Sequence, residues 1–149
     1  MANINDFSNE YANIKKITLL DGVELKTGKL GFSSSINGLI VSTYTLTTIP
    51  TSVGLSAWIP NSIVFRFNDT TGLTGTMVAS IGTNAATYDN IMPSTTFTGF
   101  NNLNQQYRYN ITGASRILYA SDVITLNLTT AFGGGGSVYF DVTIFGEVA

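Results

Sequence analysis

The side chains of this chain that could carry chemistry are carboxylates, because imidazole and thiol groups are missing altogether. None of the 149 residues is a histidine or a cysteine. Their absence from the sequence excludes Ser-His-Asp and thiol catalysis, disulfides and most zinc sites. Catalysis by carboxylates alone needs two acids that converge in a cleft. The nine acidic residues form no dense pair along the sequence, so we predict a protein that is not an enzyme.

Four aspartates lie in or beside segments that should form the folded domain. Asp69 and Asp89 fall in turn-like segments, Asp122 opens an expected strand and Asp141 points outward from another. An aspartate at a turn commonly caps its own backbone, and no ligand-spaced calcium motif joins Asp69 to Asp89. We therefore expect no catalytic residue, no cofactor and no metal site.

Glycines and aromatic residues offer two further candidate sites. The run Gly133–Gly136 has no lysine after it and opens no helix, so a hairpin loop fits it better than a phosphate cradle. Trp58 and Tyr88 are candidates for a platform on which a sugar ring could stack. The alternative for these rings, and for other aromatic residues of the chain, is packing in a core.

Charge is sparse and unevenly distributed. Only 11% of the residues are charged, against about 25% in an ordinary domain. Four of the seven basic residues lie in the first 30 positions, and the net charge is −2. No basic stripe can therefore follow a phosphate backbone, and no apolar run is long enough to span a membrane. We expect neither a nucleic-acid nor a membrane partner.

The first 37 residues differ in character from the rest. Residues 1–14 are polar and fit either a mobile tail or an arm that orders on a partner. Asp21-Gly22 between two short β-prone segments predicts a small hairpin over 16–26, and 27–37 (TGKLGFSSSIN) is loop-like. We interpret 1–37 as an attachment segment and 38–149 as the main domain. The candidate attachment residues are Phe7, Tyr11, Ile14, Ile17 and Leu19.

From residue 38 the sequence alternates short β-prone segments with turn residues. The clearest are 122–130 and 137–145, where apolar side chains recur at every second position. Further strands are expected within 38–48, 63–67, 75–81, 95–100, 107–111 and 117–120. Some eight strands at this spacing, without helical periodicity, predict an all-β protein. The expected fold is an antiparallel β-sandwich, jelly-roll-like, preceded by an N-terminal arm and the small hairpin.

Several segments from Ile59 onward follow a distinctive order. They are 59–64 (IPNSIV), 81–83 (IGT) followed by 88–90 (YDN), 122–126 (DVITL), the glycine run and the closing 138–144 (VYFDVTI). In this order they resemble a β-sandwich module of tailed-bacteriophage virion proteins, found in capsid decoration proteins, head fibres and tail-fibre tips. The resemblance covers about 90 of the 149 residues and is a layout of strands and turns, not a catalytic signature.

The resemblance implies a homotrimer that is made in the host cytoplasm and becomes part of the virion. The leading hypothesis is a capsid decoration or head-fibre protein that binds the major capsid protein, or another virion protein, through its N-terminal segment. The alternative is a tail-fibre tip that binds a receptor or a host surface glycan. A cellular trimeric β-sandwich ligand is disfavoured, because the sequence lacks cysteines and opens on no apolar signal segment.

Overall fold

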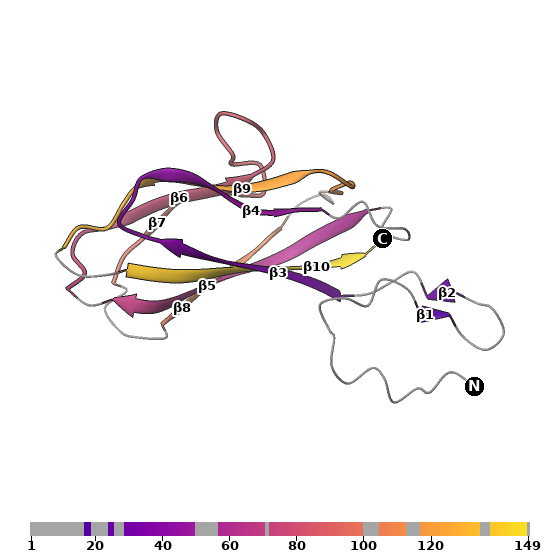
Figure 1. The fold of residues 1–149 in the computed structure, drawn as a ribbon, viewed down its shortest axis with the longest axis horizontal. Coiled ribbons are helices and arrows are strands. Elements are labelled where there is room, and N and C mark those ends of the chain that lie inside the picture. Colours follow the sequence, from indigo (N-terminus) through magenta and orange to yellow (C-terminus); the bar gives the residue numbers. More distant parts are fainter. Residues whose placement is uncertain are drawn as a thin grey trace.

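The β-prone segments pair into two four-stranded sheets that pack face to face (Figure 1). A computed structural model describes residues 17–18, 24–25, 29–49, 57–70, 72–99, 105–112, 117–134 and 138–148. One sheet has the order β3 (Lys29–Asn37), β10 (Val138–Val148), β5 (Trp58–Thr70), β8 (Gln106–Asn110). The other has the order β4 (Ser42–Thr48), β9 (Val123–Thr130), β6 (Met77–Gly82), β7 (Met92–Phe97).

The pairing is nested. β3 pairs with β10, β4 with β9, β5 with β8 and β6 with β7, and every one of these pairs is antiparallel. This is the pattern of one long hairpin wrapped into a double sheet, which defines a jelly roll. The prediction of an all-β, antiparallel, jelly-roll-like sandwich is confirmed.

Alternation of side chains builds the core between the two sheets. In β9 the side chains of Ile124, Leu126 and Leu128 are buried, and in β10 the inward positions are buried in the same way. Aromatic rings cross the middle of the layer: the centroid of Phe65 lies 4.7 Å from that of Phe97 and 6.0 Å from that of Phe140. Tilted and edge-on rings at such distances add to the burial of apolar area.

The expected hairpin before the sandwich is also present. β1 (Ile17–Thr18) and β2 (Glu24–Leu25) pair antiparallel, with Ile17 opposite Leu25. Over the described parts of the chain, no helix has the length and apolarity needed to cross a membrane.

The structure corrects the loop interpretation of 27–37, because Lys29–Asn37 is a strand of the sandwich. β3 pairs with β10 at nine successive positions, from Lys29 opposite Glu147 to Asn37 opposite Tyr139. Glycine and serine have weak strand preference, and here tertiary pairing overrides it. The sandwich therefore begins at Lys29, well before residue 38.

The glycine run is not the loop of a hairpin between the last two strands. β9 and β10 belong to different sheets, so the chain crosses from one layer to the other between them. Gly133 instead forms an isolated bridge with Thr74, with backbone hydrogen bonds of 2.8 Å in both directions. Periodicity shows which residues a strand buries, but it does not identify the strand's partner.

Candidate functional site

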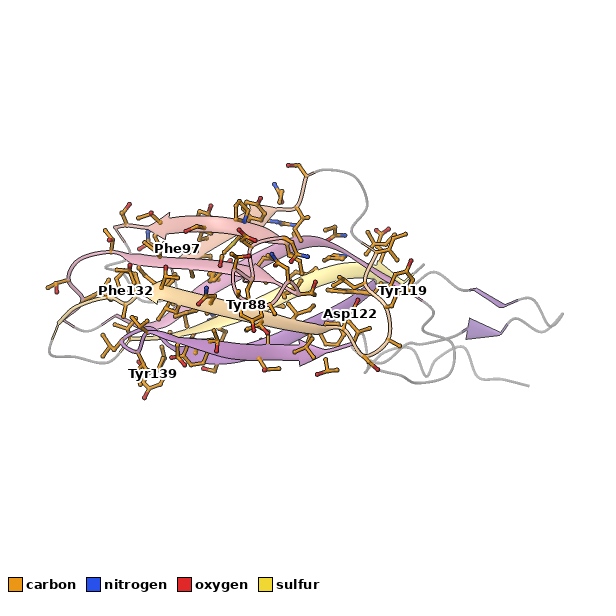
Figure 2. The ribbon with its side chains drawn as sticks, turned by 90° about the horizontal axis from the view of Figure 1, so that it is seen from above. Tyr88, Phe97, Tyr119, Asp122, Phe132 and Tyr139 are labelled. Atoms are coloured by element: carbon orange, nitrogen blue, oxygen red, sulfur yellow. The ribbon has the colours of Figure 1, made fainter. Side chains whose placement is uncertain are left out.

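The loop between β6 and β7 is the most elaborately built exposed segment that the structure describes. It rises from the outer side of the sheet that contains β6 and β9 (Figure 1). Figure 2 shows Tyr88 of this loop near the middle of the long axis, whereas Tyr119 and Tyr139 lie toward opposite ends. The loop is therefore a feature of a face of the sandwich and not of its ends.

The side chain of Asn84 organises the loop. Its Oδ1 accepts hydrogen bonds from the backbone N–H groups of Asp89 (3.0 Å) and Asn90 (3.2 Å). Its Nδ2 donates to Thr87 Oγ1 and to Asp89 Oδ1, both at 2.8 Å. Asparagine has two donors and a carbonyl acceptor, so this one residue ties the start of the loop to its end.

A second group of hydrogen bonds fixes the loop to the sheet. The backbone carbonyl of Thr87 accepts from Ser80 Oγ of β6 at 3.1 Å and from Asn127 Nδ2 of β9 at 3.4 Å. Asn90 Oδ1 accepts from the N–H of Thr83 at 2.8 Å. Because the anchors come from two adjacent strands, the loop has a fixed orientation on the sheet.

The backbone conformation of the loop is itself unusual. Ala86 has φ of 83° and Tyr88 has φ of 47°, in a region that costs non-glycine residues energy and persists only where the surroundings enforce it. At Gly82 a Cβ atom would lie 2.4 Å from Asn90 Oδ1 and 2.6 Å from the backbone carbon of Tyr88. The loop is thus preorganised: its shape is set by internal contacts before any partner binds.

Exposed apolar side chains gather at the two ends of the sandwich. Ile40 and Val41 follow β3, and Tyr139, the second residue of β10, lies opposite Asn37 of β3. Toward the other end, Ile117, Tyr119 and Val123 flank Leu118, which bridges to Trp58. Single exposed apolar residues are ordinary at a protein surface, and only contiguous patches mark contact sites.

Trp58 is not part of an exposed platform. Its side chain is 0% exposed, and its ring meets Phe32 edge-on at a centroid distance of 5.2 Å. The Nε1 atom is buried and finds no acceptor within the described chain. The two proposed platform residues come from different sheets, because Trp58 begins β5 and Tyr88 lies in the β6–β7 loop. The sugar platform is therefore wrong for Trp58 and remains a prediction for Tyr88 alone.

Four of the five candidate attachment residues lie outside the described residues. They are Phe7, Tyr11, Ile14 and Leu19. Ile17 lies in β1, opposite Leu25. The attachment role of all five stays a prediction.

Where their side chains are described, the candidate acids have local structural partners. Asp122 Oδ2 accepts from the backbone N–H of Tyr119 at 2.8 Å, and Asp141 Oδ2 accepts from Asn68 Nδ2 at 2.6 Å. Asp89 belongs to the hydrogen-bond network of the β6–β7 loop. Within the described ranges no three His, Cys, Asp or Glu side chains gather into a group that could hold a metal ion.

The sequence placed Asp89 in a turn-like segment, but it did not predict the hydrogen-bond network centred on Asn84. Asn84, Thr87, Asp89 and Asn90 occur within seven positions, and short polar side chains at such spacing favour turns closed by their own hydrogen bonds. This cluster of short polar residues was the sequence feature that could have indicated the network. The anchors Ser80 and Asn127 carried none, since only the pairing of β6 with β9 brings them beneath the loop.

Comparison with known proteins identifies a shared fold. No family model matches the sequence, and neither does any curated protein. A chain of the capsid asymmetric unit of cyanophage Pam1 superimposes with a TM-score of 0.56 at 12% identity, covering 83% of this chain and 85% of that one. Two weaker likenesses have a TM-score of 0.32. One is a chain of the disulfide-linked pili of Bacillus endospore appendages, at 10% identity, covering 83% of this chain and 89% of that one. The other is the decameric BFDV capsid protein, at 7% identity, covering 83% of this chain and 99% of that one. At such identity, the first likeness establishes that this jelly roll is shared with a chain of a bacteriophage capsid.

Proposed function

We propose that this chain is a structural protein of a virion. The observation that carries the proposal is the jelly-roll strand order, together with the TM-score of 0.56 to a chain of the cyanophage Pam1 capsid over 83% of the sequence. A fold alone does not define a function, but the sequence points the same way. It lacks histidine and cysteine, and its low charge favours extended protein contacts over catalysis.

Within the virion, the role we propose is capsid decoration or a head fibre, with residues before β3 as the attachment segment. β3 starts at Lys29, which pairs with Glu147 near the end of β10. Val148 in turn pairs with Trp58, and Trp58 bridges to Leu118. The attachment segment therefore enters the sandwich at the end that also carries exposed Ile117, Tyr119 and Val123, so segment and apolar group can act on one partner surface.

The attachment role is tested by deleting residues 1–15 and measuring co-sedimentation with empty capsids of the parent virus. We expect the deletion variant to remain in the supernatant while the full chain pellets. Circular dichroism should show the same β signal for both, because the deleted residues precede every strand of the sandwich. Undiminished pelleting of the deletion variant would contradict attachment through this segment.

The proposed assembly is a homotrimer, a closed ring of identical subunits. Light scattering of the full chain, measured on a monodisperse peak, is expected to give a mass of three times the 15.9 kDa chain, or a multiple of that trimer. A mass of one or two chains would overturn the trimer without affecting the capsid-binding test.

The alternative is a receptor-binding or glycan-binding tip, and the β6–β7 loop is the observation that favours it. The loop is preorganised and carries the half-buried Tyr88 next to the exposed Asp89 in the sequence. Binding on a glycan array that Tyr88→Ala abolishes and Tyr119→Ala leaves intact would support this role. Absence of any glycan signal for the full chain would remove it.

A further inference from the structure

The four edge strands of the sandwich differ in how well they are protected against pairing with another chain. An edge strand presents unpaired backbone groups, and proteins usually blunt it with a charge, a proline, a bulge or a short length. β8 has five residues and carries the exposed Arg108. β7 contains Pro93 and has a register shift against β6. Both edge strands on this side of the molecule therefore have such a device.

β4 is protected in another way. Its register against β9 shifts between Thr45 and Thr47, which makes Leu46 the extra residue of a bulge. The backbone carbonyl of Leu46 accepts a 2.6 Å hydrogen bond from Ser34 Oγ of β3. The bulge thus breaks the regular edge of β4 and directs this carbonyl toward the other sheet.

Beyond Lys29 at its first position, β3 has none of these devices. It is nine residues long and pairs with β10 without a register shift, whereas the pairing of β10 with β5 shifts twice. Between Leu30 and Asn37 it contains no proline and no charged residue. The side chains on its solvent face include Ser33 and Ser35, both exposed and small. Among the described edge strands, β3 alone is long, regular and uncharged along its middle.

We propose that β3 is a pairing surface for a second copy of this chain, joined antiparallel about a two-fold axis through Ser33. An isologous contact requires one surface to be complementary to itself. For the nine residues Lys29–Asn37, complete antiparallel overlap places Ser33 opposite Ser33 of the second copy. The β3-containing sheet of one copy then continues into the same sheet of the second copy through the β3–β3 seam.

Charge selects the antiparallel orientation. Lys29 is the one charged residue of β3. In the antiparallel arrangement it lies opposite Asn37 of the second copy, whereas in-register parallel pairing would set the two Lys29 residues against each other. Like charges directly opposite one another destabilise a strand pair. A second copy is favoured over a charged partner because the middle of the strand offers no charge to complement.

The side chains along the seam also fit this arrangement. On the solvent face, Gly31 would lie opposite Ser35 and Ser33 opposite Ser33, so small groups meet where strands approach closely. On the inner face, Phe32 would lie opposite Ser34. Phe32 is only half-buried in the single chain although its ring contacts the buried Trp58. The second copy would cover the remaining apolar surface of Phe32, which contributes to association.

A cysteine cross-link tests the seam directly, because the chain has no cysteine of its own. Cα atoms of residues directly opposite in an antiparallel pair are about 4.5–5.5 Å apart, which is within disulfide reach. Ser33→Cys is expected to form a disulfide-linked dimer almost completely on mild oxidation. The matched control is Asn110→Cys, an exposed position on β8 at the opposite edge of the same sheet. Equal cross-linking of both variants, or none for Ser33→Cys, would overturn the proposal.

A charge exchange tests the symmetry of the contact. Ser33→Lys places two lysines face to face and is expected to halve the native mass measured by light scattering, while Asn110→Lys leaves it unchanged. An equimolar mixture of Ser33→Lys and Ser33→Glu should recover the wild-type mass. If Ser33→Lys keeps the wild-type mass, or if the mixture fails to recover it, the two-fold seam is wrong.

The seam goes beyond the proposed function and can fail independently of it. A three-fold ring cannot contain a two-fold contact within itself, so the seam would join two trimers. Halving from six chains to three supports both the seam and the trimer. A fall in native mass from two chains in the wild type to one in Ser33→Lys supports the seam and overturns the trimer. A mass of three chains for both proteins supports the trimer and overturns the seam.

Discussion

The β6–β7 loop and the edge strand β3 are both exposed, but different interactions determine their backbone conformations. In the loop, side chains determine the backbone: Asn84 alone makes four hydrogen bonds, and Ala86 and Tyr88 are held at positive φ. In β3 the backbone is regular, and the exposed side chains are small serines. The loop is complete within one chain, whereas β3 has a neighbouring strand on one side only among the described residues. A preorganised loop suits recognition of a different molecule, and an unprotected edge suits repetition of the same one.

The largest effect that separates the two regions is expected from adding one methyl group to each. Gly82→Ala places a Cβ 2.6 Å from the backbone carbon of Tyr88, where the neighbour cannot move without distorting the loop. Overpacking of this kind costs about 1–3 kcal/mol of unfolding free energy. Urea denaturation measures the loss.

Gly31→Ala in β3 is the matched control for that substitution. Its Cβ would lie 3.5 Å from the ring of Phe145, an ordinary contact, and alanine restricts the unfolded chain more than glycine does. We expect an unchanged or slightly higher unfolding free energy. Equal losses for the two variants would show that the loop is no more tightly built than the edge.

Removing the hydrogen-bonding side chain of the loop should have the next largest effect. Asn84→Ala deletes its bonds to Thr87, Asp89 and Asn90. A net loss of about 1–2 kcal/mol is expected, because part of each bond is replaced by water. The variant should also show faster amide exchange at residues 84–90, with β10 unaffected. Unchanged exchange in the loop would mean that its positive-φ conformation does not depend on Asn84.

A smaller loss of unfolding free energy is expected from removing the hydroxyl of Tyr44. This hydroxyl donates to the backbone carbonyl of Ile40 at 2.8 Å in the turn after β3. Tyr44→Phe should cost about 0.5–1.5 kcal/mol at neutral pH. Desolvation by burial raises the pKa of Tyr44. A raised folded-state pKa stabilises the protein fully below the unfolded-state value of about 10, and this contribution disappears as the pH rises through the folded-state pKa. The wild type should therefore lose stability more steeply above pH 10 than Tyr44→Phe does, and parallel pH profiles would contradict this.

The smallest effect on folding is expected for Ser33→Lys. An exposed substitution away from special features changes stability by less than about 0.5 kcal/mol, and Ser33 is exposed on β3. Its only described side-chain bond is a 3.2 Å contact with Thr143 Oγ1, itself at the surface. The denaturation midpoint should stay near that of the wild type at a protein concentration where both are dissociated. A large loss would show that this edge is part of the folded unit and not a surface available for assembly.

The sequence by itself determined the class of fold and the contents of its core. The alternation of Ile124, Leu126 and Leu128, and of Phe140, Val142 and Ile144, specified which side chains would be buried, because side chains point to opposite faces at every step of a strand. The β-prone segments around Asp21-Gly22 likewise predicted a local hairpin, and Ile17–Thr18 does pair with Glu24–Leu25.

Only the tertiary structure decided how distant segments are paired. Ser33–Ser35 became part of a strand because β10, more than 100 positions away, supplies hydrogen-bond partners. Trp58 became buried because β3 and β10 surround it with Phe32 and Gly146. The β6–β7 loop gained its anchors from Ser80 and Asn127 only when β6 and β9 lay side by side. Local pattern sets which face of a strand is buried, but the free energy of pairing depends on residues far apart in sequence, and these meet only in the folded chain.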